Sequence, residues 1–327
     1  MAYDDIIGSD EAGDLIPEKE RDEILKGLPA ASAALSLGRQ VSMSTRTEKQ
    51  PVLSALPNAY WVNGDTGLKQ TTKAMWDNKT LRAEELAVLV PIPDSIAADS
   101  KIDLFAEIKP LLIEAIGAKV DEAVIWGEDT PYDDEGLVAG AIQAGNIVVP
   151  GSIEDENGNN DLALDIGGID ANSGDLGLMG LVEDDGFGVT GFAASTRLKS
   201  RLRGLRDQNG GLLFQPSLQA GTPDTLYGEP LKYVDGNGAW DQDVADIIGG
   251  DWTKLICAIR QDLTFKVFEE GVISDDEGKV LLNLMQQDSK VLRVVFRLAF
   301  AVANPINRKS QVEEDRYPFA VLGDGGS

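Results

Sequence analysis

The sequence predicts an α+β fold, because strand and helix patterns follow one another without a regular strand–helix–strand rhythm. Two segments carry this prediction. In residues 82–93, apolar residues recur with the period of two that a strand requires: Leu86, Val88, Val90 and Ile92. In residues 99–127, they recur at steps of three or four, as on one face of a helix: Phe105, Ile108, Leu112, Ile116, Val120 and Ala123. We find no internal repeat.

The composition indicates a globular chain with an acidic surface. Its 327 residues are enough for two compact units, and 43% of them are hydrophobic and 26% charged. The formal net charge of −26 disfavours a protein that reads nucleic acid, since binding to phosphates needs clustered Lys and Arg. A container that must not adhere to its nucleic acid is compatible with this charge.

Several classes of chemistry are excluded by residues that the chain lacks. The sequence contains no histidine, which excludes a Ser-His-Asp triad, a Cys-His pair and histidine-ligated metals. Cys257 is the one cysteine, so we expect neither an internal disulfide nor a thiolate zinc cluster. The N-terminal residues lack a signal-peptide pattern, and no stretch approaches the ~18 apolar residues that span a bilayer. We expect a soluble chain that stays in the cell that makes it, without a cofactor and without membrane contact.

The N-terminal part predicts an arm followed by a long extended loop. Residues 1–45 alternate acidic and small apolar blocks and build no domain, although a short helix fits near Pro17. Residues 46–81 show no sustained period, which indicates a β-ribbon or a loop. A structureless stretch of this length is unusual inside a compact domain, so we expect its partner to lie outside its own domain.

Prolines limit both of the clearest elements. Pro91 and Pro93 predict that the strand ends there or lies at the edge of a sheet. Pro110 costs ~3 kcal/mol in a helix interior, so the helix either kinks there or begins near Lys109. Gly127 is a suitable C-terminal stop for this helix.

The remaining residues predict shorter elements. Residues 131–191 are rich in Gly, Asp and Asn, and pieces such as residues 141–153 are expected to form strands and turns. Residues 196–207 predict a second helix with an apolar face formed by Leu198, Leu202 and Leu205. Residues 291–305 predict a long strand near the end of the chain.

Two loops match ligand motifs only in part. Residues 186–191, GFGVTG, match G-x-G-x-x-G, but the dinucleotide fingerprint needs a strand before it and a helix after it. Residues 155–161, DENGNND, lack the Gly and Glu of a calcium loop at the required positions. We interpret the first as a flexible turn and the second as a solvated turn, and the acidic runs 133–135 and 275–277 as exposed charge. A nucleotide-binding enzyme and a calcium-dependent surface protein stay as alternatives.

Two clusters are candidates for contact with another copy of the chain. The first is the aromatic set of the extended loop, since Tyr and Trp bury much area at interfaces; its alternative is a hairpin folded back with the rings in its own core. The second is the basic segment 197–206, which either is a helix solvated by its own charges or pairs with acidic surface on another copy.

Motifs in a particular order connect these elements to a known family. The extended loop contains Ala59, Trp61 and Val62, and the long helix ends in DEAVIWG. LRGLRDQNGGLLFQP, LYGEPLKYVD and QDSKVLRVVFRLAFAVANP follow, the last with Arg293 and Arg297. This order resembles that of the major capsid proteins of tailed bacteriophages, which have the Hong Kong 97 type fold. The resemblance extends over roughly residues 45 to 320.

The resemblance implies a Hong Kong 97-like capsid fold and a major capsid protein whose icosahedral shell encloses double-stranded phage DNA. It implies an N-terminal arm (1–45), an extended β-hairpin loop (46–81), a peripheral domain with the spine helix (82–131 and 254–304) and an axial domain (132–253 and 305–327). The expected partners are further copies in pentamers and hexamers, a separate scaffolding protein, portal and decoration proteins, and packaged DNA contacted non-specifically. Assembly is expected in the bacterial host cytoplasm. Encapsulin nanocompartment shells, which share the fold, are the nearest alternative.

The predicted contacts between subunits come from the extended loop and the basic segment. The candidates are Tyr60, Trp61, Lys69, Lys73, Trp76, Arg197, Lys199, Arg201, Arg203 and Arg206. Some relatives crosslink a loop lysine to an asparagine of the next subunit, but nothing local identifies such a pair here. Truncation of Trp61 to alanine is expected to impair assembly and to leave the subunit folded.

Overall fold

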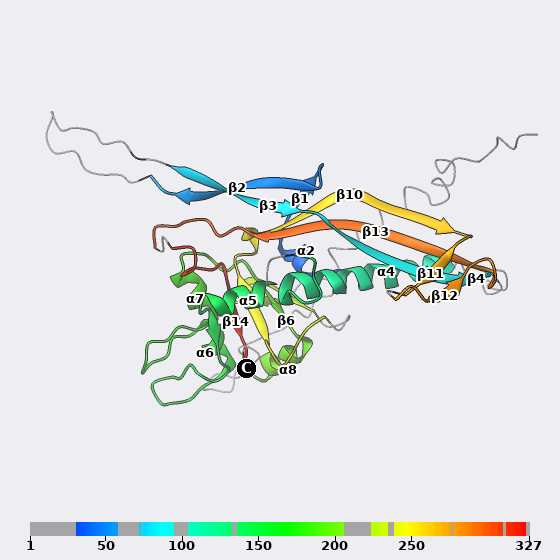
Figure 1. Ribbon diagram of the computed structural model, residues 1–327. Coiled ribbons are helices and arrows are strands. Elements are labelled where there is room, and N and C mark those ends of the chain that lie inside the picture. The colour runs from blue at the N-terminus through cyan, green and yellow to red at the C-terminus, as the bar shows by residue number, and fades with distance from the viewer. Residues whose placement is uncertain are drawn as a thin grey trace, which may run out of the picture.

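Two β-sheets and one long helix organise the chain. The computed structural model describes residues 31–57, 72, 74–94, 104–132, 136–205, 224–234, 239–275, 277–309 and 312–324. A four-stranded sheet of long strands lies along helix α4 (Leu104–Asp121), and a six-stranded sheet of short strands lies beside one end of that helix (Figure 1). A two-stranded ribbon extends past the four-stranded sheet on the side away from α4 (Figure 1).

The four-stranded sheet has the order β1-β10-β13-β4. Its strands are β1 (Arg39–Met43), β4 (Glu84–Pro93), β10 (Leu255–Phe268) and β13 (Ser289–Val302). Strand β1 is parallel to β10, and the other neighbours are antiparallel. The predicted strand in residues 82–93 is confirmed, with alternating burial and a place at the sheet edge. The predicted late strand is also confirmed, and it ends three residues before Pro305.

Helix α4 (Leu104–Asp121) continues past Pro110 and ends in a π-helical turn (Glu122–Trp126). The expectation of a start near Lys109 is therefore wrong. Pro110 costs the helix one backbone hydrogen bond. Packing of the buried residues Leu112, Ile116 and Val120 against the four-stranded sheet, just after the proline, offsets this cost. The predicted stop is confirmed, because Gly127 has a φ of 70°, which glycine adopts without strain.

The six-stranded sheet has the order β5-β14-β9-β6-β8-β7. Its strands are β5 (Ile147–Val148), β6 (Gly191–Ala194), β7 (Thr225–Leu226), β8 (Glu229–Tyr233), β9 (Ile247–Gly250) and β14 (Phe319–Leu322). Within the described part of the chain, four helices lie around it: α5 (Gly136–Gln143), α6 (Leu162–Gly167), α7 (Leu178–Asp184) and α8 (Thr196–Gly204). A second hydrophobic core lies here, and the predicted helix in residues 196–207 is confirmed, with Leu198 and Leu202 buried.

In residues 131–191, the expectation that pieces such as residues 141–153 form strands and turns is confirmed for β5 and the turns beside it, but the helices of this segment were not predicted. The segment contains α5, α6 and α7, and residues 141–143 end α5 before β5 begins. Each glycine in a helix interior costs up to about 1 kcal/mol relative to alanine, so the local sequence is a poor guide here. Gly140 is required by packing, because a Cβ there would lie 2.6 Å from the Tyr317 ring.

Trp252 joins the two sheets. It begins the 3-10 turn Trp252–Lys254, between the end of β9 and the start of β10. The ring is 1% exposed, its Nε1 donates to the Gly191 carbonyl at 2.9 Å, and it meets Phe319 edge to face at 5.2 Å. A buried aromatic ring whose N–H group has a hydrogen-bond partner stabilises this junction.

The first described helix packs beneath the four-stranded sheet. Helix α2 (Ala33–Leu37) contributes Ala33, Ala34 and Leu35 to the core that also holds α4. None of the helices in the described ranges has the length and apolarity needed to cross a bilayer.

The buried Cys257 thiol is expected to be unreactive in the folded subunit. It donates to the Ala34 carbonyl, and burial raises its pKa to about 12. Because the thiolate is the nucleophile, iodoacetamide at pH 8 should label native protein negligibly and guanidinium-unfolded protein fully. Mass spectrometry measures this difference. Rapid labelling of native protein would mean that α2 leaves its place against β10.

Candidate subunit-contact surfaces

The ribbon consists of β2 (Thr47–Ala55) and β3 (Met75–Arg82), paired antiparallel from Thr47 opposite Arg82 to Ala55 opposite Met75. It points away from both cores (Figure 1). Trp76 is 64% exposed and Met75 is 54% exposed. The Trp76 ring therefore does not lie in the core of its own subunit. Tyr60, Trp61, Lys69 and Lys73 lie outside the described residues.

The base of the ribbon is anchored to the subunit. Leu81 and Ala83 are buried in a small apolar cluster on the four-stranded sheet. The outer end of the described ribbon is held as well. The Ile306 amide donates to the carbonyl of Leu53, which lies opposite Trp76, at 3.0 Å, and the Arg308 guanidinium donates to the Pro57 carbonyl at 3.0 Å. The ribbon is thus tied to the subunit near both ends of its described strands, while the exposed side chains of Met75 and Trp76 are available to another molecule.

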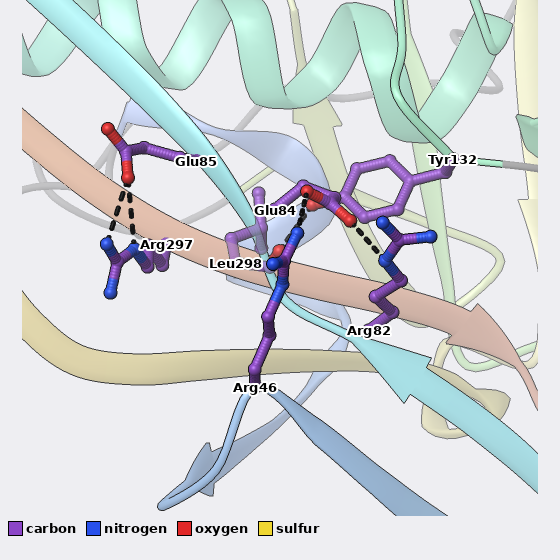
Figure 2. A network of polar contacts seen from close by, with 7 residues as sticks. All are labelled: Arg46, Arg82, Glu84, Glu85, Tyr132, Arg297 and Leu298. Atoms are coloured by element: carbon purple, nitrogen blue, oxygen red, sulfur yellow. Dashed lines mark hydrogen bonds and ion pairs between the residues drawn. The ribbon is translucent and has the colours of Figure 1, made fainter.

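A charge network fixes the strand that leaves the ribbon (Figure 2). Glu84 pairs with Arg46 at 3.3 Å and with Arg82 at 2.5 Å. Glu85 accepts two hydrogen bonds from Arg297, at 3.0 and 3.2 Å. Sequence reasoning missed both acids, because their partners come from three different segments; only the register of β4 opposite β13 brings Glu85 to Arg297.

Tyr132 lies beside this network and contacts strand β13. Its hydroxyl donates to the Leu298 carbonyl of β13, and burial raises the pKa of that hydroxyl well above its ordinary value. This contact ties the segment after α4 to the four-stranded sheet (Figure 2).

The basic segment pairs partly within its own subunit. Lys199 lies 3.2 Å from Asp224 and 4.7 Å from the centre of the Tyr233 ring, and Arg201 pairs with Asp246. For these two residues, internal pairing accounts for the charge. Arg197 and Arg203 are exposed on α8, whereas Arg206 lies outside the described residues.

Asp121 is the first residue of the DEAVIWG motif that ends the long helix, and no role for its side chain was apparent from the sequence. In the structure, this side chain binds the first turn of α2. It is fully buried and accepts hydrogen bonds from the Ser32 hydroxyl at 2.6 Å and from the Ala33 and Ala34 amides at 3.0 Å. Burial raises the pKa of its carboxyl, against the opposing effect of these hydrogen bonds. Gly117, one turn earlier, leaves no room for a side chain because Ala31 lies against it. Asp121 thus seats the N-terminal segment on α4.

The two loops that matched ligand motifs are structural turns. Helix α7 precedes residues 186–191 and strand β6 follows them, the reverse of the order that dinucleotide binding requires. The nucleotide-binding alternative is therefore wrong. In residues 155–161, the Asp155 carboxylate accepts from the Asn157 and Asn159 amides, both at 2.8 Å, which makes a self-satisfied turn.

Comparisons with known proteins agree with this geometry. A model of the phage capsid family matches residues 12–307. A major capsid protein of Staphylococcus phage 80alpha is 27% identical over 304 residues, which cover 92% of this chain and 86% of that protein. A solved structure from Microbacterium phage Oxtober96 is 37% identical, with a TM-score of 0.72, and covers 90% of this chain and 91% of that one. A structure from Mycobacterium phage Cain is 27% identical, with a TM-score of 0.71 and 98% coverage of both chains.

The chain belongs to the phage capsid family. It has the Hong Kong 97-like capsid fold and the function of a phage major capsid protein, as its motifs predicted. It is therefore a structural component of the virion that assembles with other copies into a shell.

Proposed function

We propose that copies of this chain form an icosahedral shell of pentamers and hexamers around double-stranded phage DNA, with the ribbon of each copy lying on a neighbour. One observation carries this proposal: an anchored ribbon holds Met75 and Trp76 exposed, away from any core of its own subunit. An exposed tryptophan beside an exposed methionine is typical of a surface that another protein covers. Head-to-tail contacts of this kind close into rings.

The two sheets support the proposed division of the subunit into two domains. In this proposal the four-stranded sheet and α4 belong to the peripheral domain, residues 82–131 and 254–304, and the six-stranded sheet belongs to the axial domain, residues 132–253 and 305–327. One hydrophobic core contains residues of both sheets, and a second lies on the six-stranded sheet. Residues 46–81 form the extended loop, and residues 1–45 the arm, of which α2 and β1 pack against the peripheral domain.

Charge supports the same contact. Residues 46–82 contain six basic and three acidic residues, a net charge of +3, in a chain whose net charge is −26. A basic ribbon on an acidic body is attracted to any neighbouring copy. The exposed Arg197 and Arg203 of α8 add a second basic surface that suits an acidic neighbour. The acidic remainder suits a lining along which DNA slides.

Formation of shells by the purified chain tests this function. Negative-stain microscopy should show closed shells, formed alone or with the scaffolding protein of the same phage. Because the Debye length falls from about 10 Å at 0.1 M salt to about 3 Å at 1 M, we expect slower assembly at high salt, measured by light scattering. Monodisperse 35 kDa subunits under all these conditions would overturn the proposal. A cargo enzyme that co-purifies in place of viral proteins would favour an encapsulin shell.

The proposed shell implies three further kinds of protein partner. A scaffolding protein would set its size, a portal would replace one vertex, and decoration proteins would bind outside. Assembly would take place in the host cytoplasm before DNA is packaged. Omission of the scaffolding protein in the microscopy experiment tests the first of these.

A further inference from the structure

The loop that follows β13 and helix α5 together line an acidic cavity. The cavity has a volume of about 550 Å³, and the loop contributes Glu313, Glu314 and Asp315 to its lining. All three acids are exposed. Lys79 of the ribbon lies 3.8 Å from Glu313, whereas Glu314 and Asp315 make no ion pair within the described part of the chain. The cavity thus presents two carboxylates that its own subunit does not neutralise.

Two buried polar side chains of the lining also lack partners. Asn304 is 9% exposed and Arg316 is 4% exposed. The Asn304 amide donates to the carbonyls of Glu313 and Arg316, at 3.0 and 2.8 Å, and the Arg316 guanidinium donates to the carbonyls of Asn304 and Pro305, both at 3.2 Å. These bonds tie the two ends of the loop together and hold its acids in place.

The atoms left over indicate what kind of ligand the cavity takes. The Asn304 Oδ1 and the Arg316 Nη1 are buried and have no hydrogen-bond partner among the described residues. Buried polar atoms without partners are rare in folded proteins, so a partner from outside the subunit is expected. One of these atoms is an acceptor and the other is a donor. A metal ion would satisfy only the acceptor, whereas the surface of another protein presents both donors and acceptors.

The acidic cavity and helix α8 lie at opposite edges of the six-stranded sheet. Helix α5, which lines the cavity, packs on β14 next to the edge strand β5. Helix α8 lies at the other edge, where Lys199 lies over the Tyr233 ring of β8 and pairs with Asp224, just before β7. Surfaces on opposite sides of a subunit make head-to-tail contacts, and such contacts close into rings.

Arg197 is the residue of α8 that suits the acidic cavity. It is exposed and makes no ion pair in the part of the chain that the structure describes, whereas Lys199 and Arg201 are paired internally. Its guanidinium has five N–H donors in a planar fork, which matches carboxylates in two-point hydrogen bonds. Glu314 and Asp315 supply such carboxylates.

We propose that Arg197 of one subunit binds the acidic cavity of the next subunit around each pentamer and hexamer. The loop that follows β13 lies below the ribbon in Figure 1, and the bond from the Ile306 amide to the Leu53 carbonyl joins the two. The neighbour that receives the ribbon is therefore also the neighbour that presents Arg197. Packaged DNA is a poor occupant, because the carboxylates of the cavity repel phosphates. The inference rests on the proposed function.

Crosslinking in shells tests this contact without removing its charges. Ser200→Cys lies one turn from Arg197 on the same face of α8, and Gln143→Cys lies on α5 at the cavity; both positions are exposed. Buried Cys257 does not compete for a maleimide. With a short bis-maleimide, shells of the double variant should give a ladder of linked chains on denaturing electrophoresis, up to pentamers and hexamers. Each single variant should give no ladder.

The matched control moves one cysteine away from the cavity. Ser200→Cys with Glu277→Cys, in the turn between β11 (Val272–Ser274) and β12 (Val280–Asn283), should give no ladder. A ladder of equal strength in this control, or dimers alone in the test variant, would contradict a head-to-tail contact at the cavity. Shells without links would remove this inference alone, whereas absence of shells in the unsubstituted protein would remove the proposed function as well.

Charge reversal gives a second measurement. Arg197→Glu brings a like charge to the acidic cavity, so we expect shell yield to fall by about tenfold or more while thermal unfolding of the subunit stays unchanged. Adding Glu314→Arg should restore assembly in part. Adding Glu277→Arg instead gives the same net charge and should not restore it. Normal assembly of Arg197→Glu, or equal recovery in the two double variants, would overturn the inference.

Discussion

Replacing Trp76 with alanine is expected to prevent shell formation and to leave the subunit folded. The ring is 64% exposed and contributes little to its own subunit, so the free energy of unfolding should change by less than about 0.5 kcal/mol. Buried against a neighbour, a tryptophan of this kind is worth about 2–4 kcal/mol per contact. Since 1.4 kcal/mol is tenfold in affinity, each contact weakens about 30-fold or more, and a shell multiplies that loss over every copy.

Two measurements separate this effect from misfolding. Thermal unfolding of Trp76→Ala subunits should match that of the unsubstituted protein, while negative-stain microscopy shows few or no shells. Trp76→Phe keeps a large ring and should restore assembly in part. If Trp76→Ala assembles normally, the ribbon does not use this ring. If it unfolds as a monomer, the ring stabilises its own ribbon.

Long, strongly periodic segments were predictable from the sequence. Strand β4 follows its period of two, because one face of an edge strand lies on the core and the other faces away. The late strand and the apolar face of α4 follow in the same way. Helix α5 was not predictable, because Gly136 and Gly140 oppose a helix locally, and only Tyr317, far along the chain, requires the second of them.

The candidate surfaces were predictable in kind but not in detail. The exposed position of Trp76 agrees with a loop that has no core face of its own. Internal pairing of Lys199 and Arg201 depends on Asp224 and Asp246, and no local pattern connects these residues. The neighbours of Arg293 and Arg297 depend on register: these two arginines were visible as spaced residues, but strand pairing places Lys266 and Arg260 opposite them.

Replacing Asp121 with alanine is expected to destabilise the subunit by about 3 kcal/mol or more, since a buried donor left unsatisfied costs about 1–3 kcal/mol. Three donors lose their acceptor: the Ser32 hydroxyl and the Ala33 and Ala34 amides. The first turn of α2 then has no partner on α4. Denaturant unfolding measures the loss, and limited proteolysis should cut near residue 32 first.

Asp129→Ala is the matched control, because it removes a carboxylate a few residues away. Asp129 is exposed and pairs with Lys119 at 2.6 Å, and exposed ion pairs contribute about 0–1 kcal/mol. If the two variants lose equal stability, Asp121 does not seat the N-terminal segment.

The dependence on pH gives the Asp121 prediction a second signature. Because burial raises the pKa of the Asp121 carboxyl in the folded state, this group stabilises the fold most below its unfolded pKa of about 3.9. That contribution falls as the pH rises through the folded pKa, where the buried carboxyl becomes charged. The stability difference between the unsubstituted protein and Asp121→Ala should therefore narrow from acidic to neutral pH. A difference that widens instead would mean that the hydrogen bonds from Ser32, Ala33 and Ala34 favour the carboxylate more than burial opposes it.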